Sequence, residues 1–116
     1  RFLALDAMGS EHARAELRRL REALVERGEP APRILQEGLA LLENTDLRSA
    51  LPTLTRPSLW LAGQRDRLVD ARAMHAAAAL APGAHAATVT GGGHAPFLGH
   101  ADVVAEAVKH FVAAMA

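Results

Sequence analysis

The sequence predicts an α/β fold in which a helical segment precedes alternating strands and helices. Apolar and β-branched runs lie near 58–62 and 86–90, and each is followed by a stretch with helical periodicity. The part of the chain before them contains no convincing strand. Because strands that alternate with helices of this length form parallel βαβ units, we divide the chain into a helical cap or lid segment, 1–46, and an α/β core, 47–116.

Charge and composition exclude several classes of protein. With 50% hydrophobic and 22% charged residues, the 116-residue chain has enough apolar material for one modest domain. Its 13 basic and 13 acidic residues cancel, so no overall basic field attracts nucleic acid or an anionic membrane. The absence of Cys excludes disulfides, a thiolate metal site and a cysteine nucleophile, and it fits a cytoplasmic location. No apolar run approaches the ~20 residues of a membrane-spanning helix.

Two amphipathic helices are predicted in the cap segment. Ser10 is a suitable N-terminal cap for a helix over 11–27, and Gly28 ends it. A second helix, over 32–44, has Pro32 in its first turn. In the first helix, the residues that recur at helical spacing are expected to form a buried stripe; they are Leu17, Leu20 and Leu24. In the second helix, the residues with this spacing are Ile34, Leu35, Leu39 and Leu42.

The core segment is predicted to run strand, helix, strand, helix, with the helices near 70–81 and 101–115. Asp70 can cap the first of these helices, and the Pro-Gly pair at 82–83 closes it. Two strands alone cannot form a parallel sheet that is covered on both faces. We therefore expect further strands from an upstream half of the same fold or from a second chain. The start at Arg1 rather than Met fits the carboxyl half of a longer protein, as it would fit a processed chain.

An acidic residue and a histidine follow the two strands in an order typical of hydrolases. Asp66 lies just after the first strand, and His94 lies 28 residues later, behind the glycines at 91–93. The carboxyl ends of parallel strands meet at one edge of a sheet. An acid followed by a histidine is the second part of the Ser…Asp…His order of α/β hydrolases. We therefore predict that Asp66 orients His94 as a catalytic base.

Other interpretations of these positions remain open. Asp70 could replace Asp66 as the acid, because it lies only four residues further on. Arg65 and Arg67 could instead make the acid loop a solvated set of ion pairs. His94 could be merely a turn residue, although its position behind three glycines and its acidic partner favour a catalytic role.

The chain lacks a nucleophile of its own. Ser10, Ser49 and Ser58 are its three serines, and none lies in a Gly-x-Ser-x-Gly turn. The remaining histidines show no metal-ligand spacing and are expected at the surface or at helix ends: His12, His75, His85, His100 and His110. The glycines at 91–93 do not open a phosphate-binding helix. We therefore expect neither a metal nor a cofactor.

Five segments of the sequence are informative as a set. They are Arg-Phe-Leu-Ala-Leu at 1–5, Met-Gly at 8–9, Thr-Asp-Leu-Arg at 45–48, the acid loop at 63–69 and His-Ala-Pro-Phe at 94–97. Together they resemble the carboxyl-terminal half of the pimeloyl-acyl-carrier-protein methyl ester esterases of biotin synthesis. The acid and histidine loops are common to α/β hydrolases, whereas the cap segments narrow the family. The resemblance implies the carboxyl-terminal part of an α/β-hydrolase fold and a serine carboxylesterase acting on that methyl ester, with the serine on an upstream half.

The resemblance also assigns binding residues in the cap. It implies that Arg1, Arg14 and Arg18 bind the acyl-carrier protein and that Phe2 lines the acyl pocket. Arg14 and Arg18 are four residues apart, and such a helix face suits the phosphate and the acidic helix of a carrier protein. The alternatives are a solvated charged face, since several glutamates share the helix, and a core role for Phe2.

Two other functions stay open. Another capped α/β hydrolase, acting on a small ester, a lactone or a carbon–carbon bond, would have the same acid and histidine loops. A non-catalytic fragment that binds a carrier protein through its cap helix would need no nucleophile. A Gly-x-Ser-x-Gly turn after an upstream strand would favour a hydrolase over the binding fragment.

Overall fold

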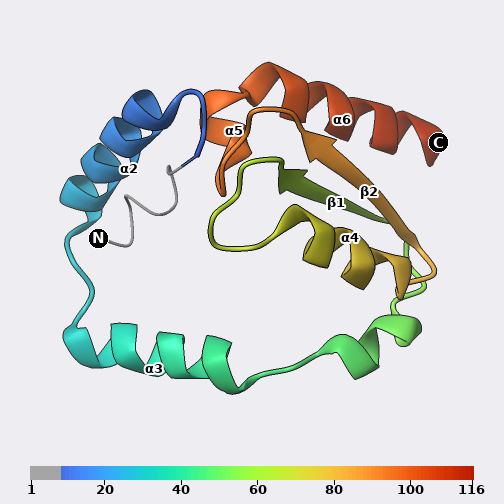
Figure 1. Cartoon of the computed structure of the whole chain (residues 1–116), viewed down its shortest axis with the longest axis horizontal. Coiled ribbons are helices and arrows are strands. Elements are labelled where there is room, and N and C mark those ends of the chain that lie inside the picture. The colour runs from blue at the N-terminus through green and yellow to red at the C-terminus, as the bar shows by residue number, and fades with distance from the viewer. Residues whose placement is uncertain (1–8) are drawn as a thin grey trace.

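The computed structural model describes residues 9–116 and shows helices arranged around a parallel pair of strands (Figure 1). The elements follow one another as α2 (Ala13–Arg27), α3 (Pro32–Asn44), η1 (Arg48–Thr53), β1 (Ser58–Gly63), α4 (Ala71–Ala79), β2 (Ala84–Val89), α5 (Pro96–Gly99) and α6 (Ala101–Ala114). The order of strands and helices confirms the predicted α/β class. Arg1 and Phe2, which were predicted to bind ligands, lie outside the described residues. The predicted boundary between 46 and 47 falls between α3 and η1 and stays a prediction.

The two strands form a parallel sheet that brings their carboxyl ends to one edge. Within the described residues the sheet has only β1 and β2, paired from Ser58 opposite Ala84 to Gly63 opposite Val89. α4 connects the strands and packs against both, and α6 also contacts both. The buried apolar residues are small and come from the sheet, α4 and the adjoining loops: Ala62, Ala78, Ala81, Val89 and Ala95.

α2 begins at Ala13, two residues later than predicted. Ser10 is not the residue that precedes the helix: its Oγ accepts a hydrogen bond from the His12 N–H at 3.2 Å and donates one to Glu16 Oε1 at 2.7 Å. The Glu16 side chain is fully buried, whereas the leucines of the predicted stripe are only half-buried. The first turn of α2 therefore packs through a hydroxyl–carboxyl pair, because it faces the loop after β2 and α5 rather than an apolar core.

The other differences from prediction concern two short helices and the start of one strand. η1 and α5 were not predicted, since segments of six and four residues cannot show helical periodicity. α5 has Pro96 at its first position, where a missing N–H costs no helical hydrogen bond. β2 begins at Ala84 rather than 86. Asp70, by contrast, caps α4 as predicted: its carboxylate accepts a hydrogen bond from the backbone N–H of Arg72 at 2.8 Å.

α3 has the predicted bounds but lies apart from the sheet (Figure 1). Its apolar residues, including Ile34, Leu35 and Leu42, are exposed. A helical stripe of this kind normally packs on another element. α3 thus presents an apolar face that nothing within residues 9–116 covers.

The helices in the described part of the chain are all too short or too polar to cross a membrane.

Gly63, the last residue of β1, lies against the loop that follows β2. A methyl group on Gly63 would lie 2.6 Å from the carbonyl oxygen of Gly92 and closer still to that of Gly93. Because these contacts are to backbone, we expect Gly63→Ala to lower the unfolding free energy by about 2–3 kcal/mol, measured by chemical denaturation.

Gly38→Ala is the matched control, since nothing lies within 4 Å of a methyl group there. Gly38 is inside α3, so alanine should be neutral or stabilising by up to about 1 kcal/mol. A Gly63→Ala protein as stable as the unmodified one would contradict the close approach.

Candidate active site

Backbone hydrogen bonds join the loop after β1 to the loop after β2. The Gln64 N–H donates to the Val89 carbonyl at 3.0 Å, and the Arg65 N–H donates to the Gly92 carbonyl at 2.8 Å. The Gln64 side chain adds a third link, because its Oε1 accepts from the Gly91 N–H at 2.9 Å. Sequence reasoning did not single out Gln64, although its place directly after a strand was a usable signal. The two loops therefore form one unit at the edge of the sheet.

This unit brings Asp66 and His94 together. His94 Nδ1 lies 2.9 Å from Asp66 Oδ2, at hydrogen-bonding distance. The other carboxylate oxygen, Oδ1, accepts from the N–H groups of Leu68 at 2.8 Å and Val69 at 3.0 Å. The Asp66 side chain is 7% exposed and that of His94 37%. The acid is thus fixed and shielded, while the imidazole reaches toward solvent.

Burial and hydrogen bonding act in opposite directions on Asp66. Burial raises the pKa of this carboxyl, but the hydrogen bonds from Val69, His94 and Leu68 together outweigh it, so the pKa lies below its usual range. Asp66 is therefore ionised at neutral pH and accepts a hydrogen bond from the N–H group at His94 Nδ1. In that tautomer, proton transfer to or from a substrate would use Nε2.

Asp70, the rival acid, is engaged elsewhere. Its side chain caps α4 and lies 2.9 Å from the Arg72 guanidinium. The hydrogen bond from the Arg72 side chain is the main reason that the pKa of Asp70 falls to about 2. The geometry therefore favours Asp66 over Asp70 as the partner of His94.

Two of the three serines, Ser10 and Ser58, have local structural contacts. Ser10 donates to the buried Glu16, and Ser58 accepts from Trp60 Nε1 at 3.0 Å. Ser49 is exposed in η1. The described residues thus hold an acid and a base arranged as in a catalytic triad, without a nucleophile turn beside them.

Arg14 and Arg18, the predicted carrier-binding residues, are both exposed on α2. Their neighbour Arg19 is also exposed, and its guanidinium donates a hydrogen bond to the Leu98 carbonyl of α5 at 2.9 Å. An exposed arginine face fits both interpretations made from the sequence, a docking surface and a solvated helix face. Its role in binding stays a prediction.

A second polar cluster, which sequence reasoning missed, lies beside α5. Glu11, His12 and His100 each place a potential ligand atom within 4.8 Å of the others. The His12 and His100 rings are 4.7 Å apart, and His100 Nε2 lies 2.7 Å from Glu11 Oε1. Glu11 and His100 are 89 residues apart, so no spacing rule could have joined them.

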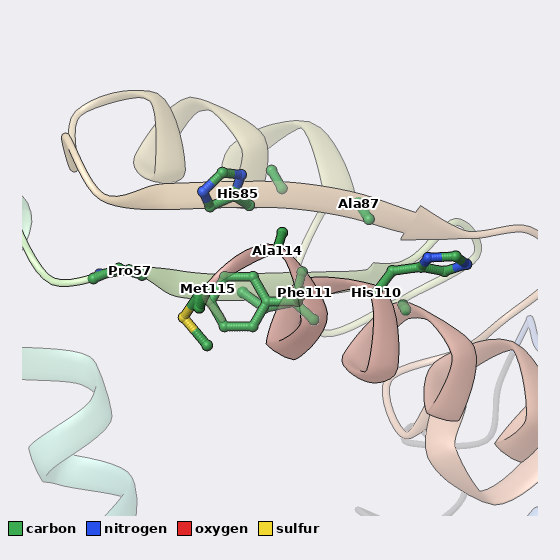
Figure 2. A pocket seen from close by; sticks show the side chains of 10 residues that line it. Pro57, His85, Ala87, His110, Phe111, Ala114 and Met115 are labelled. Carbon is green, nitrogen blue, oxygen red and sulfur yellow. The ribbon is translucent and has the colours of Figure 1, made fainter.

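An apolar cavity lies on the side of the sheet that faces α6. It has a volume of about 610 Å³, and its lining includes Phe111, Met115 and Pro57 (Figure 2). His85 of β2 lies on its rim, with its ring edge-on to Phe111 at 5.6 Å. Neither Asp66 nor His94 lines it, so the cavity is a packing face rather than part of the acid–base site.

Curated proteins resemble this chain closely. The pimeloyl-[acyl-carrier protein] methyl ester esterase of Xanthomonas oryzae pv. oryzae (strain MAFF 311018) is 71% identical over 115 residues, 99% of this chain and 46% of the relative. The proteins of the same name from Stenotrophomonas maltophilia (strain K279a) and Xanthomonas campestris pv. campestris (strain B100) are 73% and 72% identical, over 99% of this chain and 44% and 46% of the relatives. The chain spans just under half the length of these relatives. No protein-family model matches it.

Proposed function

We propose that this chain, which is similar to the pimeloyl-[acyl-carrier protein] methyl ester esterases over 99% of its length, is part of such an enzyme and supplies its acid and base. The observation that carries the proposal is the contact between His94 Nδ1 and Asp66 Oδ2 at the carboxyl edge of a parallel sheet. In the proposed α/β hydrolase, a serine on an upstream half is the nucleophile and the substrate is the methyl ester of pimeloyl-acyl-carrier protein in biotin synthesis.

The proposed reaction uses His94 twice. Its Nε2 accepts the serine proton as the serine oxygen attacks the ester carbonyl, and the same proton then passes to the departing methoxide, which leaves as methanol. In the second half, water gives a proton to His94 as its oxygen attacks the acyl-serine; His94 then returns that proton to the departing serine oxygen, which frees the carboxylic acid. Asp66 keeps the ring in the productive tautomer and stabilises its protonated form.

Several packing observations support an upstream half. Parallel sheets are normally buried on both faces and built from more than two strands. Here the sheet has two strands in the described part, with an apolar cavity beside it. The stripe on α3 is also exposed. A segment that adds strands next to β1 and packs under the cap would cover these surfaces.

The activity can be tested on the full-length protein that contains this chain. We expect it to release methanol and free acid from the methyl ester of pimeloyl-acyl-carrier protein, and a serine-directed phosphonate to abolish this turnover. If the protein hydrolysed small esters but not the carrier-bound ester, this result would favour another capped hydrolase. Carrier binding without hydrolysis of any ester would favour the non-catalytic binding fragment.

Carrier recognition is proposed for Arg14 and Arg18, with Arg1 and the pocket residue Phe2 assigned by the resemblance. Reversing both charges, with Arg14→Glu and Arg18→Glu, should raise KM for the carrier-bound ester by about 10-fold or more. Turnover of a small soluble ester should barely change, because both side chains are exposed on α2.

The matched control replaces the same two residues by lysine. It keeps the charge and should retain most of the carrier affinity, losing the share that depends on the guanidinium geometry. The carrier effect should also weaken as salt is raised, since exposed charges are screened beyond about 8 Å at physiological ionic strength. Equal losses on both esters would indicate a misfolded cap, and no loss on either would remove these arginines from carrier binding.

A further inference from the structure

Glu11, just before α2, contacts both ends of the segment that carries His94. The Glu11 N–H donates to the Gly91 carbonyl at 3.2 Å, and Glu11 Oε1 lies 2.7 Å from His100 Nε2. Gly91 and His100 stand on either side of His94 in the chain. Building on the proposed function, we infer that Glu11 and His100 are positioning residues, which hold segment 91–100 so that His94 meets the nucleophile and couple its position to the cap.

The loop backbone is shaped for this contact. A Cβ on Gly91 would lie 2.6 Å from the Glu11 carboxyl carbon, and Gly91 has a φ of 73°, which suits glycine. At the other end, a Cβ on Gly99 would collide with the Glu16 carboxyl and lie 3.1 Å from His12 Cβ. Glycine therefore occupies both points where the start of α2 presses on the loop.

Further contacts tie α2 to the same segment. The Arg19 guanidinium donates to the Leu98 carbonyl at 2.9 Å. Glu16, fully buried, is held by the Ser10 hydroxyl and lies against Gly99. The beginning of α2 thus touches the segment at several places on both sides of His94. A rotation of the cap helix would move this segment with it.

The His100–Glu11 hydrogen bond is the polar centre of the link. The His100 side chain is only 8% exposed, so its donor is largely shielded from water. The pKa of Glu11 is lowered chiefly by the hydrogen bond with His100, in agreement with an ionised acceptor. A charge-assisted hydrogen bond to a shielded donor is stronger than one between neutral exposed groups.

A metal ion is a weaker explanation of the same cluster. A metal-bound histidine usually donates its second ring N–H to a partner. Within residues 9–116, His100 Nδ1 has no hydrogen-bond partner, and its Nε2 is already at hydrogen-bonding distance from Glu11. His12 Nε2 lies 4.0 Å from the same Glu11 oxygen, so the three groups do not enclose one centre evenly.

The test compares variants of the full-length protein on a small soluble ester, so that carrier docking does not enter. Glu11→Gln and His100→Phe should each lower kcat about 10-fold with KM changed less than about 2-fold, because a displaced catalytic base slows chemistry rather than binding. His100→Gln keeps an N–H donor at the ε position and should restore most of kcat. Glu22→Gln, which removes an exposed carboxylate of α2, is the matched control and should behave like the unmodified protein.

A second measurement keeps the inference separate from the esterase proposal. The His94 Nδ1–H proton resonance should be sharp in the unmodified protein and in Glu22→Gln, and broadened in Glu11→Gln and His100→Phe. This holds whatever ester the protein cleaves. The inference is overturned if kcat and this resonance are both unchanged in the two variants, or if only the thermal midpoint falls. If the unmodified protein cleaves no ester, the proposed function fails, and the resonance alone decides whether Glu11 and His100 position His94.

Discussion

Replacing His94 with alanine is expected to lower ester turnover by about 10⁴-fold or more while leaving the fold nearly unchanged. The imidazole stands on a loop and is 37% exposed, so it adds little to the core. Its expected contribution is proton transfer in both halves of the reaction. Single-turnover and steady-state rates on a small ester and on the carrier-bound ester would measure the loss, and thermal unfolding would check the fold.

The matched control for this variant is His110→Ala. His110 is exposed on α6 and lines the apolar cavity, which neither Asp66 nor His94 lines (Figure 2). Its removal should leave kcat within about 2-fold of the unmodified protein, as is usual for surface changes. A His94→Ala protein that kept more than a tenth of its activity would exclude His94 from the mechanism.

The contact between Asp66 and His94 could be predicted because it depends on rules that act locally. Each residue follows a strand, and the carboxyl ends of parallel strands lie at one edge of the sheet. Residues 28 positions apart in the sequence can therefore meet, and His94 Nδ1 lies 2.9 Å from Asp66 Oδ2. The same rules favoured Asp66 over Asp70 as the acid, but they did not exclude Asp70. The choice depended on which carboxylate the backbone of its own loop would capture: Leu68 and Val69 hold Asp66, whereas Arg72 holds Asp70.

The link between the cap and the histidine loop was invisible in the sequence. Glu11 looked like the first residue of a helix and His100 like a helix end, and both interpretations are close to their local structure. Their contact depends on how α2 docks on α5, which periodicity does not encode. In the same docked arrangement Glu16 is buried and its carboxylate accepts a hydrogen bond from the Ser10 hydroxyl. Ser10 therefore does not cap the helix, and α2 begins at Ala13 rather than at residue 11.

The position of α3 was predicted correctly. Pro32 and the spacing of apolar residues gave the bounds of α3 correctly, since both signals are local. They could not say what covers its apolar face. The residues assigned to carrier and acyl binding came from resemblance alone, and no contact of the structure bears on them.

Asp66→Asn is expected to lower kcat by about 10⁴-fold, close to the effect of removing the base itself. The amide oxygen can still accept from Leu68 and Val69, so the loop should keep its shape. The amide nitrogen, however, would present a donor to His94 Nδ1. The ring would then carry its hydrogen on Nε2, where it cannot accept the serine proton.

The pH dependence of stability separates this variant further. Because the pKa of Asp66 is lowered in the folded protein, its ionised form adds stability above the pKa of the unfolded chain, and this stability is lost as pH falls through the folded pKa. Asparagine lacks this titration, so the difference in unfolding free energy between the two proteins should shrink at acidic pH. Chemical denaturation at several pH values would measure it.

Asp70→Asn is the matched control, because it changes the same atoms four residues away. Asparagine is also a good helix cap, and the Asp70–Arg72 pair is exposed, so kcat should stay within about 2-fold. If Asp70→Asn lost activity and Asp66→Asn kept it, the acid of the site would be Asp70, and the hydrogen bond from His94 to Asp66 would be structural. If both variants stayed active, His94 would act without a carboxylate partner, unlike the base of a Ser-His-Asp triad.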